Sequence, residues 1–444
     1  MKSIALHNLG CKVNGYEMDV MQQILKENGY KIVSFDENAD IYIINTCTVT
    51  NIADQKSRQM LHRAKKKNPD AVVVAVGCYV QTGEDKIAMD SAIDLAVGNN
   101  RKKDIAVILE KYLEEREKDK TLQKTAVIDI NQTKEYEEMT LPVEASAWTR
   151  GHTRAYVKIQ DGCNQFCSYC IIPYARGRVR SRMEEDILTE VSGIVKMGCQ
   201  EIVLTGIHIS SYGLDRGKAE LLQLLEKLNE VEGLQRIRLG CLEPAIITEE
   251  FVQKISTLQK LCPHFHMSLQ SGCDETLRRM NRHYTTREYL EKVEMLRKYF
   301  DRPAITTDVI VGFPGETEEE FLCTEAFLEK VHFYEMHIFK YSKRQGTRAA
   351  VMEQQVPDAV KTQRSNRLIQ LEKRMSSEYR QSFMGENIEV LLEEQKEIDG
   401  NFYQIGHTGQ YIKAALKTQE DMHNCMVTGV LTEFLKDDIM VLER

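Results

Sequence analysis

The stretch Cys163–Cys170, CNQFCSYC, places three cysteines within eight residues. This C-x₃-C-x₂-C spacing offers three ligands to a metal centre, and no fourth Cys or His is near in the sequence. A structural zinc site uses a closed set of four protein ligands. A [4Fe–4S] cluster held by three cysteines keeps one iron open for a small molecule. The spacing therefore favours an iron–sulfur cluster over a zinc site or a chance group of buried thiols. We call Cys163, Cys167 and Cys170 the compact triplet.

The composition indicates a soluble globular protein. The chain has 444 residues, 42% hydrophobic and 28% charged, which predicts two to three domains. Twelve cysteines without a secretory signal indicate a reducing, cytoplasmic environment, and no apolar run approaches the roughly 18 residues of a membrane span. The net charge of −8 argues against a wholly basic nucleic-acid binder but allows local basic patches.

Residues 1–117 alternate strands and helices, which predicts an α/β domain with a parallel sheet. Cys11, Cys47 and Cys78, here called the dispersed triplet, each follow a predicted strand, in LGCKVN, NTCTVT and VGCYVQ. Ligands of open α/β sheets bind beyond the carboxyl ends of the strands. We therefore expect the three thiols to converge on a second site. The alternative is three unrelated buried cysteines.

Residues 118–148 read as a charged linker with a short strand, and a second alternation fills residues 149–378. Its predicted strands are 155–160, 201–204, 236–239, 264–269, 304–311 and 335–339. Six strand–helix units match a partial (β/α)₆ barrel of the TIM type, in which active sites lie at the carboxyl ends of the strands. The compact triplet follows the first of these strands. Short strands in residues 379–444 predict a small all-β barrel.

The combination of both triplets resembles the methylthiotransferases, which are radical S-adenosylmethionine (SAM) enzymes with two [4Fe–4S] clusters. The resemblance covers essentially the whole chain: an N-terminal methylthiotransferase domain, a radical SAM barrel and a C-terminal TRAM domain. It is carried by the stretches LGCKVNGYE, NTCTVTNIADQKSRQ, DGCNQFCSYCIIPYARGRVRSR, LTGIHISSYG and LQSGCDETLRRMNRHY.

Within the family, these stretches are most similar to the branch that modifies threonylcarbamoyladenosine in tRNA. The isopentenyladenosine branch typically has Gln-Met-Asn after the first cysteine, where this chain has Lys12-Val13-Asn14. The branch that modifies an aspartate of a ribosomal protein diverges where this chain has Thr48-Val49-Thr50. Both branches remain alternatives, and a non-catalytic iron–sulfur or zinc protein is a more distant one.

The resemblance implies a mechanism and partners. The compact triplet would hold the cluster that binds and cleaves SAM, and the resulting 5′-deoxyadenosyl radical would take hydrogen from C2 of the adenine beside the anticodon, at position 37. The dispersed triplet would hold the cluster that carries the sulfur to be inserted. We expect tRNA as the substrate, flavodoxin or ferredoxin as the electron donor, a monomer, and no membrane.

Other site residues are predicted from their places near strand ends and in basic groups. Those expected to contact SAM are Tyr169, Thr205, Gly206, Ser268, Gln270 and Asp308. Those expected to contact RNA phosphates are Arg176, Arg178, Arg182 and Lys413. A further basic group comprises Arg278, Arg279 and Arg282. The cations considered for the threonylcarbamoyl carboxylate are Arg176, Arg344 and Arg348. The alternatives are ordinary packing for Tyr169 and solvated or ion-paired surfaces for the arginines.

Overall fold

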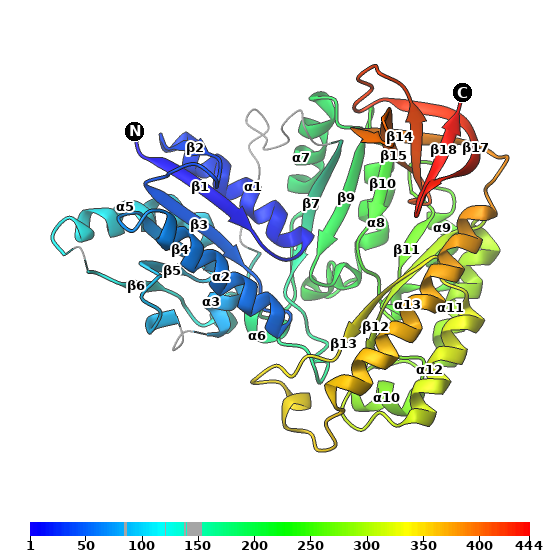
Figure 1. The fold of residues 1–444 in the computed structure, drawn as a ribbon, viewed down its shortest axis with the longest axis horizontal. Coiled ribbons are helices and arrows are strands. Elements are labelled where there is room, and N and C mark those ends of the chain that lie inside the picture. Colours follow the sequence, from blue (N-terminus) through cyan, green and yellow to red (C-terminus); the bar gives the residue numbers. More distant parts are fainter. Residues whose placement is uncertain (84–86, 120, 137–138, 140–152) are drawn as a thin grey trace.

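The computed structural model describes residues 1–83, 87–119, 121–136, 139 and 153–444. Part of the predicted linker 118–148 and the first residues of the predicted barrel region therefore lie outside the described residues. Figure 1 shows the N-terminal sheet beside the central barrel, with α1 between them, and the small C-terminal barrel against one end of the central one. No helix in the described ranges combines the length and the apolar character that crossing a membrane requires.

The N-terminal part is a parallel sheet in the order β2-β1-β3-β4-β5-β6. Its strands are β1 (Ser3–Asn8), β2 (Lys31–Val33), β3 (Ile41–Thr46), β4 (Val72–Gly77), β5 (Leu95–Val97) and β6 (Lys124–Ala126). Its helices are α1 (Lys12–Glu27), α2 (Asn51–Lys67), α3 (Cys78–Thr82) and α5 (Ile105–Arg116). Every residue of β3 and β4 is buried, as expected for apolar strands covered on both faces. The short edge strand β2 was not predicted, because three half-exposed residues carry almost no pattern.

The central part contains six consecutive parallel strands that form a partial barrel. They are β7 (Arg154–Asp161), β9 (Glu201–Gly206), β10 (Arg236–Leu239), β11 (His264–His266), β12 (Ala304–Val311) and β13 (Glu335–Lys340). A short strand β8 (Arg180–Ser181) pairs antiparallel with β7. This arrangement confirms the predicted α/β barrel.

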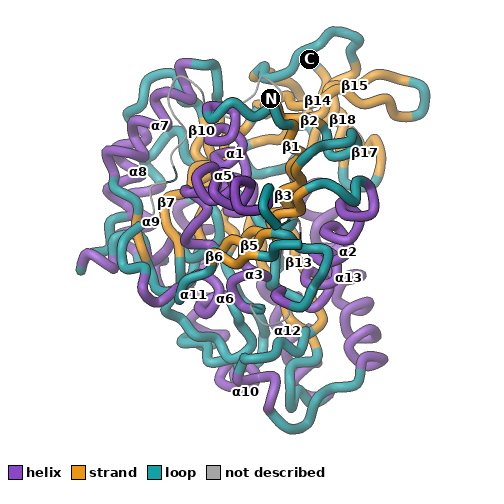
Figure 2. Tube along the Cα trace, turned by 90° about the vertical axis from the view of Figure 1, so that its left-hand side faces the viewer, coloured by secondary structure: helices purple, strands orange, loops and turns teal. Residues whose placement is uncertain are grey.

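Helices cover the outside of this barrel, as the tube view in Figure 2 also shows. They are α7 (Glu184–Lys196), α8 (Leu221–Asn229), α9 (Glu249–Ile255), α10 (Asp274–Arg279), α11 (Thr286–Tyr299), α12 (Glu318–Val331) and α13 (Asp358–Gln381). The short helix α6 (Ile172–Arg176) instead packs against α3 of the N-terminal part. Capping boxes start α11 and α12, where Thr285 and Thr317 exchange hydrogen bonds with the Glu three residues later. Apolar side chains of the outer strand faces and the helices form one large core, which holds the inner face of the barrel in place.

The C-terminal part is a closed barrel of five strands, which confirms the all-β prediction. The strands are β14 (Asn387–Ile398), β15 (Asn401–Thr408), β16 (Lys413–Lys417), β17 (Met426–Lys436) and β18 (Ile439–Glu443). It docks on the central barrel through Arg236 and Arg238, which donate to the carbonyls of His407 and Gly409, each at 2.9 Å. The ring of Tyr411 stacks on His264, with centroids 5.1 Å apart.

Candidate iron–sulfur site

The dispersed triplet lies at the carboxyl ends of neighbouring parallel strands. Cys11 follows β1 and caps α1, Cys47 follows β3, and Cys78 follows β4 as the first residue of α3. Burial, together with the neighbouring thiols of Cys78 and Cys11, raises the pKa of Cys47 to about 11. The three thiols therefore lie close enough to interact, as their equivalent placement in the sequence indicated.

The compact triplet lies in the loop after β7, on the side of the barrel that faces the N-terminal sheet. Its loop is fastened to the segment after α10, because the Ser168 amide donates to the Met280 carbonyl at 3.0 Å and Asn281 donates to the Phe166 carbonyl at 3.1 Å. Burial raises the pKa of Cys170 to about 12, with Cys167 and Cys163 adding to the effect. The helix α6 that follows packs against α3 of the N-terminal part, so the two triplets face a common interface.

Glycines with positive φ precede a cysteine in each triplet. Gly77 has φ +104°, and a Cβ there would lie 2.7 Å from Asn45 Oδ1. Gly162 has φ +72°, and a Cβ there would lie 1.8 Å from the Arg178 carbonyl oxygen. Only glycine tolerates these turns, which swing the following cysteine away from its strand end. The Gly-Cys pairs in LGC, VGC and DGC are the sequence signal of this geometry. These turns were not predicted from the sequence.

The spacing of the sulfur atoms distinguishes between a single ion and a cluster. Within the described part of the chain, three His, Cys, Asp or Glu ligand atoms lie within 4.8 Å of one another at one place, formed by His266, Asp308 and His337. Each cysteine triplet therefore has at least two sulfurs more than 4.8 Å apart. A zinc ion with Zn–S bonds of about 2.3 Å holds its sulfurs no more than about 4.6 Å apart. As they stand, both triplets are too wide for one zinc ion.

Each triplet has a buried arginine against one of its sulfurs. Arg176 Nε donates to Cys78 Sγ at 3.2 Å, and Arg282 Nη1 donates to Cys167 Sγ at 3.0 Å. Arg282 also pairs with Glu243 at 2.5 Å. A guanidinium is always charged, so each contact places a positive charge against one sulfur of the triplet.

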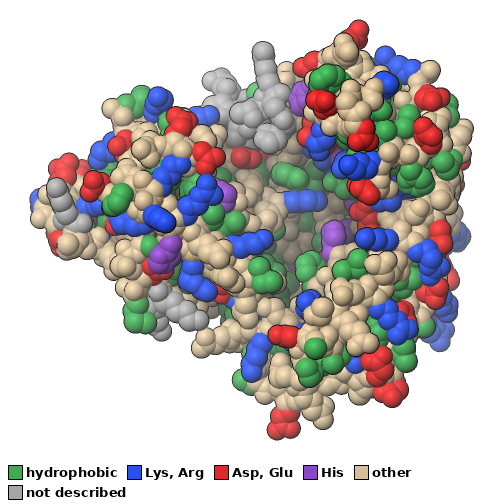
Figure 3. Space-filling view, in the orientation of Figure 1, with side chains coloured by type: hydrophobic (Ala, Val, Ile, Leu, Met, Phe, Trp, Pro, Cys, Tyr) green, Lys and Arg blue, Asp and Glu red, His purple; other side chains and the backbone are tan. Residues whose placement is uncertain are grey.

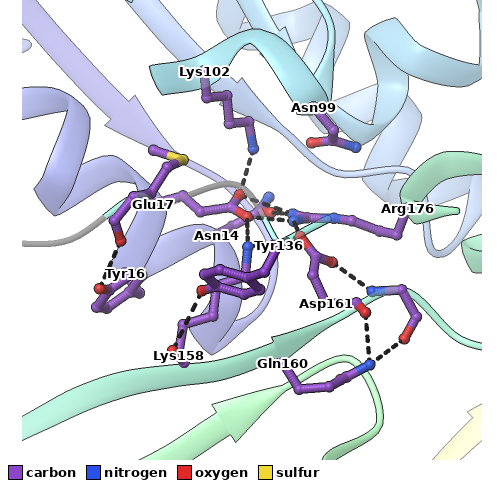
Figure 4. Close-up of polar contacts among 12 residues, drawn as sticks. Asn14, Tyr16, Glu17, Asn99, Lys102, Tyr136, Lys158, Gln160, Asp161 and Arg176 are labelled. Carbon is purple, nitrogen blue, oxygen red and sulfur yellow. Dashed lines mark hydrogen bonds and ion pairs between the residues drawn. The ribbon is translucent and has the colours of Figure 1, made fainter. Parts of the chain in front are cut away.

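Arg176 belongs to a buried ion network that joins the N-terminal part to the barrel (Figure 4). Glu17 of α1 accepts from Lys102 at 2.6 Å, from Lys158 of β7 at 2.7 Å and from Arg176 at 3.0 Å. Asp161 accepts from Lys158 at 2.7 Å and pairs with Arg176 at 3.3 Å. Burial alone would raise the pKa of Glu17, but Arg176, Lys102 and Lys158 lower it well below its ordinary value. We call these five residues the buried ion network.

The network corrects part of the predicted RNA contacts. Arg176 and Arg182 are each only 1% exposed, and Arg182 is paired with Glu190. Both guanidinium groups are paired with carboxylates inside the protein, so the expectation that they face RNA phosphates is wrong. Arg178 is exposed, with its guanidinium 4.5 Å from the centroid of the Phe166 ring. Lys413 is partly exposed on the C-terminal barrel, 3.7 Å from Asp438.

Arg344, one of the cations considered for the substrate carboxylate, is also internal. It is 6% exposed and contacts Thr48 at 2.6 Å, Asn51 at 2.7 Å and Asp54 at 2.8 Å. It therefore fastens the loop after β13 to the start of α2, close behind Cys47. Arg348 is exposed, and no ion pair of its side chain is found among the described residues.

The residues expected to contact SAM lie on one wall of the barrel, at or near the carboxyl ends of its strands. Thr205 and Gly206 end β9, and Gln270, with φ +72°, donates from its amide to the Asp308 carbonyl at 2.8 Å. Ser268 lies 2.6 Å from Cys241 Sγ. Tyr169 packs edge-on against Phe313, with centroids 6.4 Å apart.

Asp308 lies within β12, not at its end, and is held by two histidines. His337 Nδ1 lies 3.0 Å from Asp308 Oδ1, and His266 Nε2 lies 3.5 Å from Asp308 Oδ2. Burial alone would lower the pKa of His266, but Cys241 and Asp308 raise it to about 10. Neither histidine was assigned a role from the sequence, since isolated histidines on strands give no distinctive signal.

A deep hollow separates the N-terminal sheet from the barrel on the face drawn in Figure 3, and basic and histidine side chains lie within it. Side chains on inner strand faces are open to it: Tyr156 of β7 is 36% exposed and Phe339 of β13 is 46% exposed. The side chains of the barrel therefore do not fill its interior, and a cleft remains between the N-terminal part and the barrel.

Comparisons with known proteins match the chain over nearly its whole length. The radical SAM superfamily matches residues 157–328, and the uncharacterized protein family UPF0004 matches residues 3–98. The chain is 42% identical over 424 residues to the threonylcarbamoyladenosine tRNA methylthiotransferase MtaB of Bacillus subtilis (strain 168), covering 95% of this chain and 92% of that protein. It is 37% identical over 403 residues to the tRNA-2-methylthio-N(6)-dimethylallyladenosine synthase of Thermoanaerobacter pseudethanolicus, covering 89% and 83%.

A solved structure shares the fold. The radical SAM methyltransferase TsrM of Kitasatospora setae superposes with a TM-score of 0.55 at 16% identity, covering 76% of this chain and 73% of that one. At this identity the likeness shows a common architecture of an α/β domain and a radical SAM barrel.

Proposed function

The chain belongs to the radical SAM methylthiotransferase family, and from that premise we propose that it converts N6-threonylcarbamoyladenosine at position 37 of tRNA to its 2-methylthio derivative. The observation that carries this proposal is the 42% identity to a threonylcarbamoyladenosine tRNA methylthiotransferase, which extends over 95% of the chain. The family also implies that the enzyme uses a [4Fe–4S] cluster and SAM.

We assign the compact triplet to the cluster that binds SAM and the dispersed triplet to a second [4Fe–4S] cluster. Support comes from the width of both triplets, which exceeds that of a single zinc site, and from the buried arginine against one sulfur of each. When bound, the two clusters and SAM would supply radical hydrogen abstraction at adenine C2 and the sulfur to be inserted.

The protein's own residues orient these groups and exclude water. The buried ion network fixes α1, and with it Cys11, against β7 of the barrel, so the dispersed triplet keeps one position relative to the compact one. Tyr169, Thr205 and Gly206 are assigned to SAM because they lie on or beside the compact triplet's wall of the barrel. Ser268 and Gln270, in the segment after β11, and Asp308 of β12 are assigned to SAM with them.

For tRNA, Arg178 and Lys413 remain as proposed phosphate contacts, since both are accessible. Arg178 lies beside the compact triplet, and Lys413 lies on the C-terminal barrel that resembles a TRAM domain. We further propose a cytoplasmic monomer that receives electrons from a flavodoxin or a ferredoxin.

The experiment that tests the function uses reconstituted enzyme, SAM, a reductant and sulfide with two tRNA substrates. One carries threonylcarbamoyladenosine and the other carries isopentenyladenosine. Nucleoside mass spectrometry should show the 2-methylthio product only from the first. Conversion of the isopentenyl substrate would support the second branch, to which the 37% identical relative belongs by name. Conversion of neither tRNA would contradict both.

A further inference from the structure

We propose that Lys12 is the cation that recognises the carboxylate of the threonylcarbamoyl group in the cleft between the N-terminal part and the barrel. This inference rests on the proposed function and names the residue that decides between its two tRNA substrates. It follows from three observations: the position of Lys12, its lack of an internal partner, and the exclusion of rival cations.

Lys12 lies at the first turn of α1, directly after Cys11, and its side chain enters the cleft. Its Nζ lies 6.0 Å from the centroid of the exposed Tyr156 ring on β7. Lys12 is exposed, and two cations lie in the same region: Arg154, two residues from Tyr156 on β7, and Arg238 of β10 both lie against the Tyr411 ring, 5.2 Å and 4.8 Å from its centroid. Lys12 therefore reaches across the interface to the inner face of the barrel.

In the part of the chain that the structure describes, Lys12 forms no salt bridge, unlike its cationic neighbours. Arg154 pairs with Glu393 at 3.0 Å and Arg238 with Glu201 at 2.8 Å. The first turn of α1 contains no acidic residue. An accessible cation near other cations and without a carboxylate of its own is stabilised by an anionic ligand, and a charge-assisted hydrogen bond to that ligand is stronger than a neutral one.

The cations considered from the sequence fit this role less well. Arg176 and Arg344 are buried and already paired inside the protein, Arg176 with Glu17 and Arg344 with Asp54. Arg348 is accessible, but it belongs to the loop after β13, whose next residue, Ala349, donates from its amide to the Ser168 carbonyl at 2.7 Å. This places Arg348 behind the compact triplet's loop, whereas Lys12 lies beside a ligand of the dispersed triplet.

The wall near Lys12 offers hydrogen-bond partners for the rest of the substituent. Cys241 is exposed, and it contacts both Ser268 and His266. His337, also exposed, continues this wall from β13. Among the described residues, a pocket with an accessible unpaired lysine, a histidine held by Asp308 and a hydroxyl donor offers partners for both the carboxylate and the hydroxyl of a threonyl group. An isopentenyl group could pair with none of them.

The test combines a change in the protein with a change in the ligand. Two anticodon stem-loop RNAs are compared, one with threonylcarbamoyladenosine and one in which the substituent's carboxylate is replaced by a neutral carboxamide. The wild-type enzyme should favour the carboxylate in kcat/KM and in equilibrium binding by about 10- to 100-fold, the range of a hydrogen bond to a charged group. Lys12→Gln should lose this preference, because the substitution weakens binding and turnover of the carboxylate substrate and leaves those of the carboxamide substrate unchanged.

Controls separate recognition from damage to the site. Lys12→Arg should retain most of the preference, and Lys103→Gln, which changes an exposed lysine on the N-terminal part, should behave as wild type. Iron content and SAM cleavage without RNA should be unchanged in Lys12→Gln. Equilibrium binding of the stem-loops keeps the test decisive if turnover of that variant is lost.

Each remaining outcome decides against the proposal. A preference retained in Lys12→Gln would overturn it, and a preference lost in Arg348→Gln but not in Lys12→Gln would transfer the role to Arg348. In both cases conversion of threonylcarbamoyladenosine tRNA by wild-type enzyme would leave the proposed function standing. A wild-type enzyme that ignores this tRNA would overturn the proposed function together with the inference.

Discussion

Replacement of Glu17 by Gln tests whether the buried ion network holds the N-terminal part on the barrel. Glu17 is 1% exposed and accepts from three cations, two of which, Lys158 and Arg176, belong to the barrel. The amide has nearly the shape of the carboxylate but no charge. The substitution therefore leaves three buried cations with Asp161 as their single counter-charge within the network.

The expected loss of stability is about 3–5 kcal/mol, the typical cost of removing one partner from a buried pair. The gross attraction is larger. At the 3.0 Å that separates Arg176 from Glu17, an effective dielectric constant of about 20 gives about 5.5 kcal/mol for one contact. Desolvation of the charges cancels much of this, so the sum over three contacts is not the measured quantity.

The assay is urea unfolding of the anaerobically reconstituted protein, followed by circular dichroism and by hydrogen exchange of α1 and β7. The first unfolding transition should move to lower urea, and exchange should rise in both elements. Glu110→Gln, an exposed residue of α5, is the matched control and should change stability by less than about 0.5 kcal/mol. A Glu17→Gln protein indistinguishable from this control would refute the reasoning.

Three further predictions concern the clusters, the RNA surface and pH. Replacing either cysteine triplet by alanines should halve an iron content of about eight per chain, and only loss of the compact triplet should abolish SAM cleavage; iron analysis and detection of 5′-deoxyadenosine check this. Arg178→Gln should lower the slope of the logarithm of the tRNA binding constant against the logarithm of salt concentration by about 0.9. Arg182→Gln should destabilise the fold without a direct change in this slope, and filter binding at several salt concentrations measures both. Asp161 is buried, but Lys158, Arg176 and Arg180 lower its pKa in the folded state. The ionised carboxylate therefore stabilises the folded state above the unfolded pKa of about 3.9, and this contribution is lost as pH falls below that value. Asp161→Asn should therefore flatten the acid limb of the urea midpoint against pH, and an unchanged limb would contradict the assignment.

The sequence by itself determined the architecture and singled out the two cysteine triplets as proposed cluster ligands. Alternation of apolar strands and amphipathic helices predicted both α/β parts, because the spacing of apolar residues along a helix or a strand shows which of its faces is buried. The same pattern predicted that Cys11, Cys47 and Cys78 converge, since the carboxyl ends of parallel strands meet at one edge of a sheet. The compact triplet required only local spacing.

Only the tertiary structure decided which charges are free. Arg176, Arg178 and Arg182 alternate in one short stretch and look equivalent in the sequence, yet two are buried in ion pairs and one is exposed. Their partners, Glu17 and Glu190, come from segments that periodicity does not connect to them. Whether a long cationic side chain faces solvent or a carboxylate depends on contacts between distant elements, because its own helix or strand leaves both choices open. For the same reason the sequence did not predict Lys12 as a binding residue, and we propose this role from its place in the cleft between the two parts of the chain.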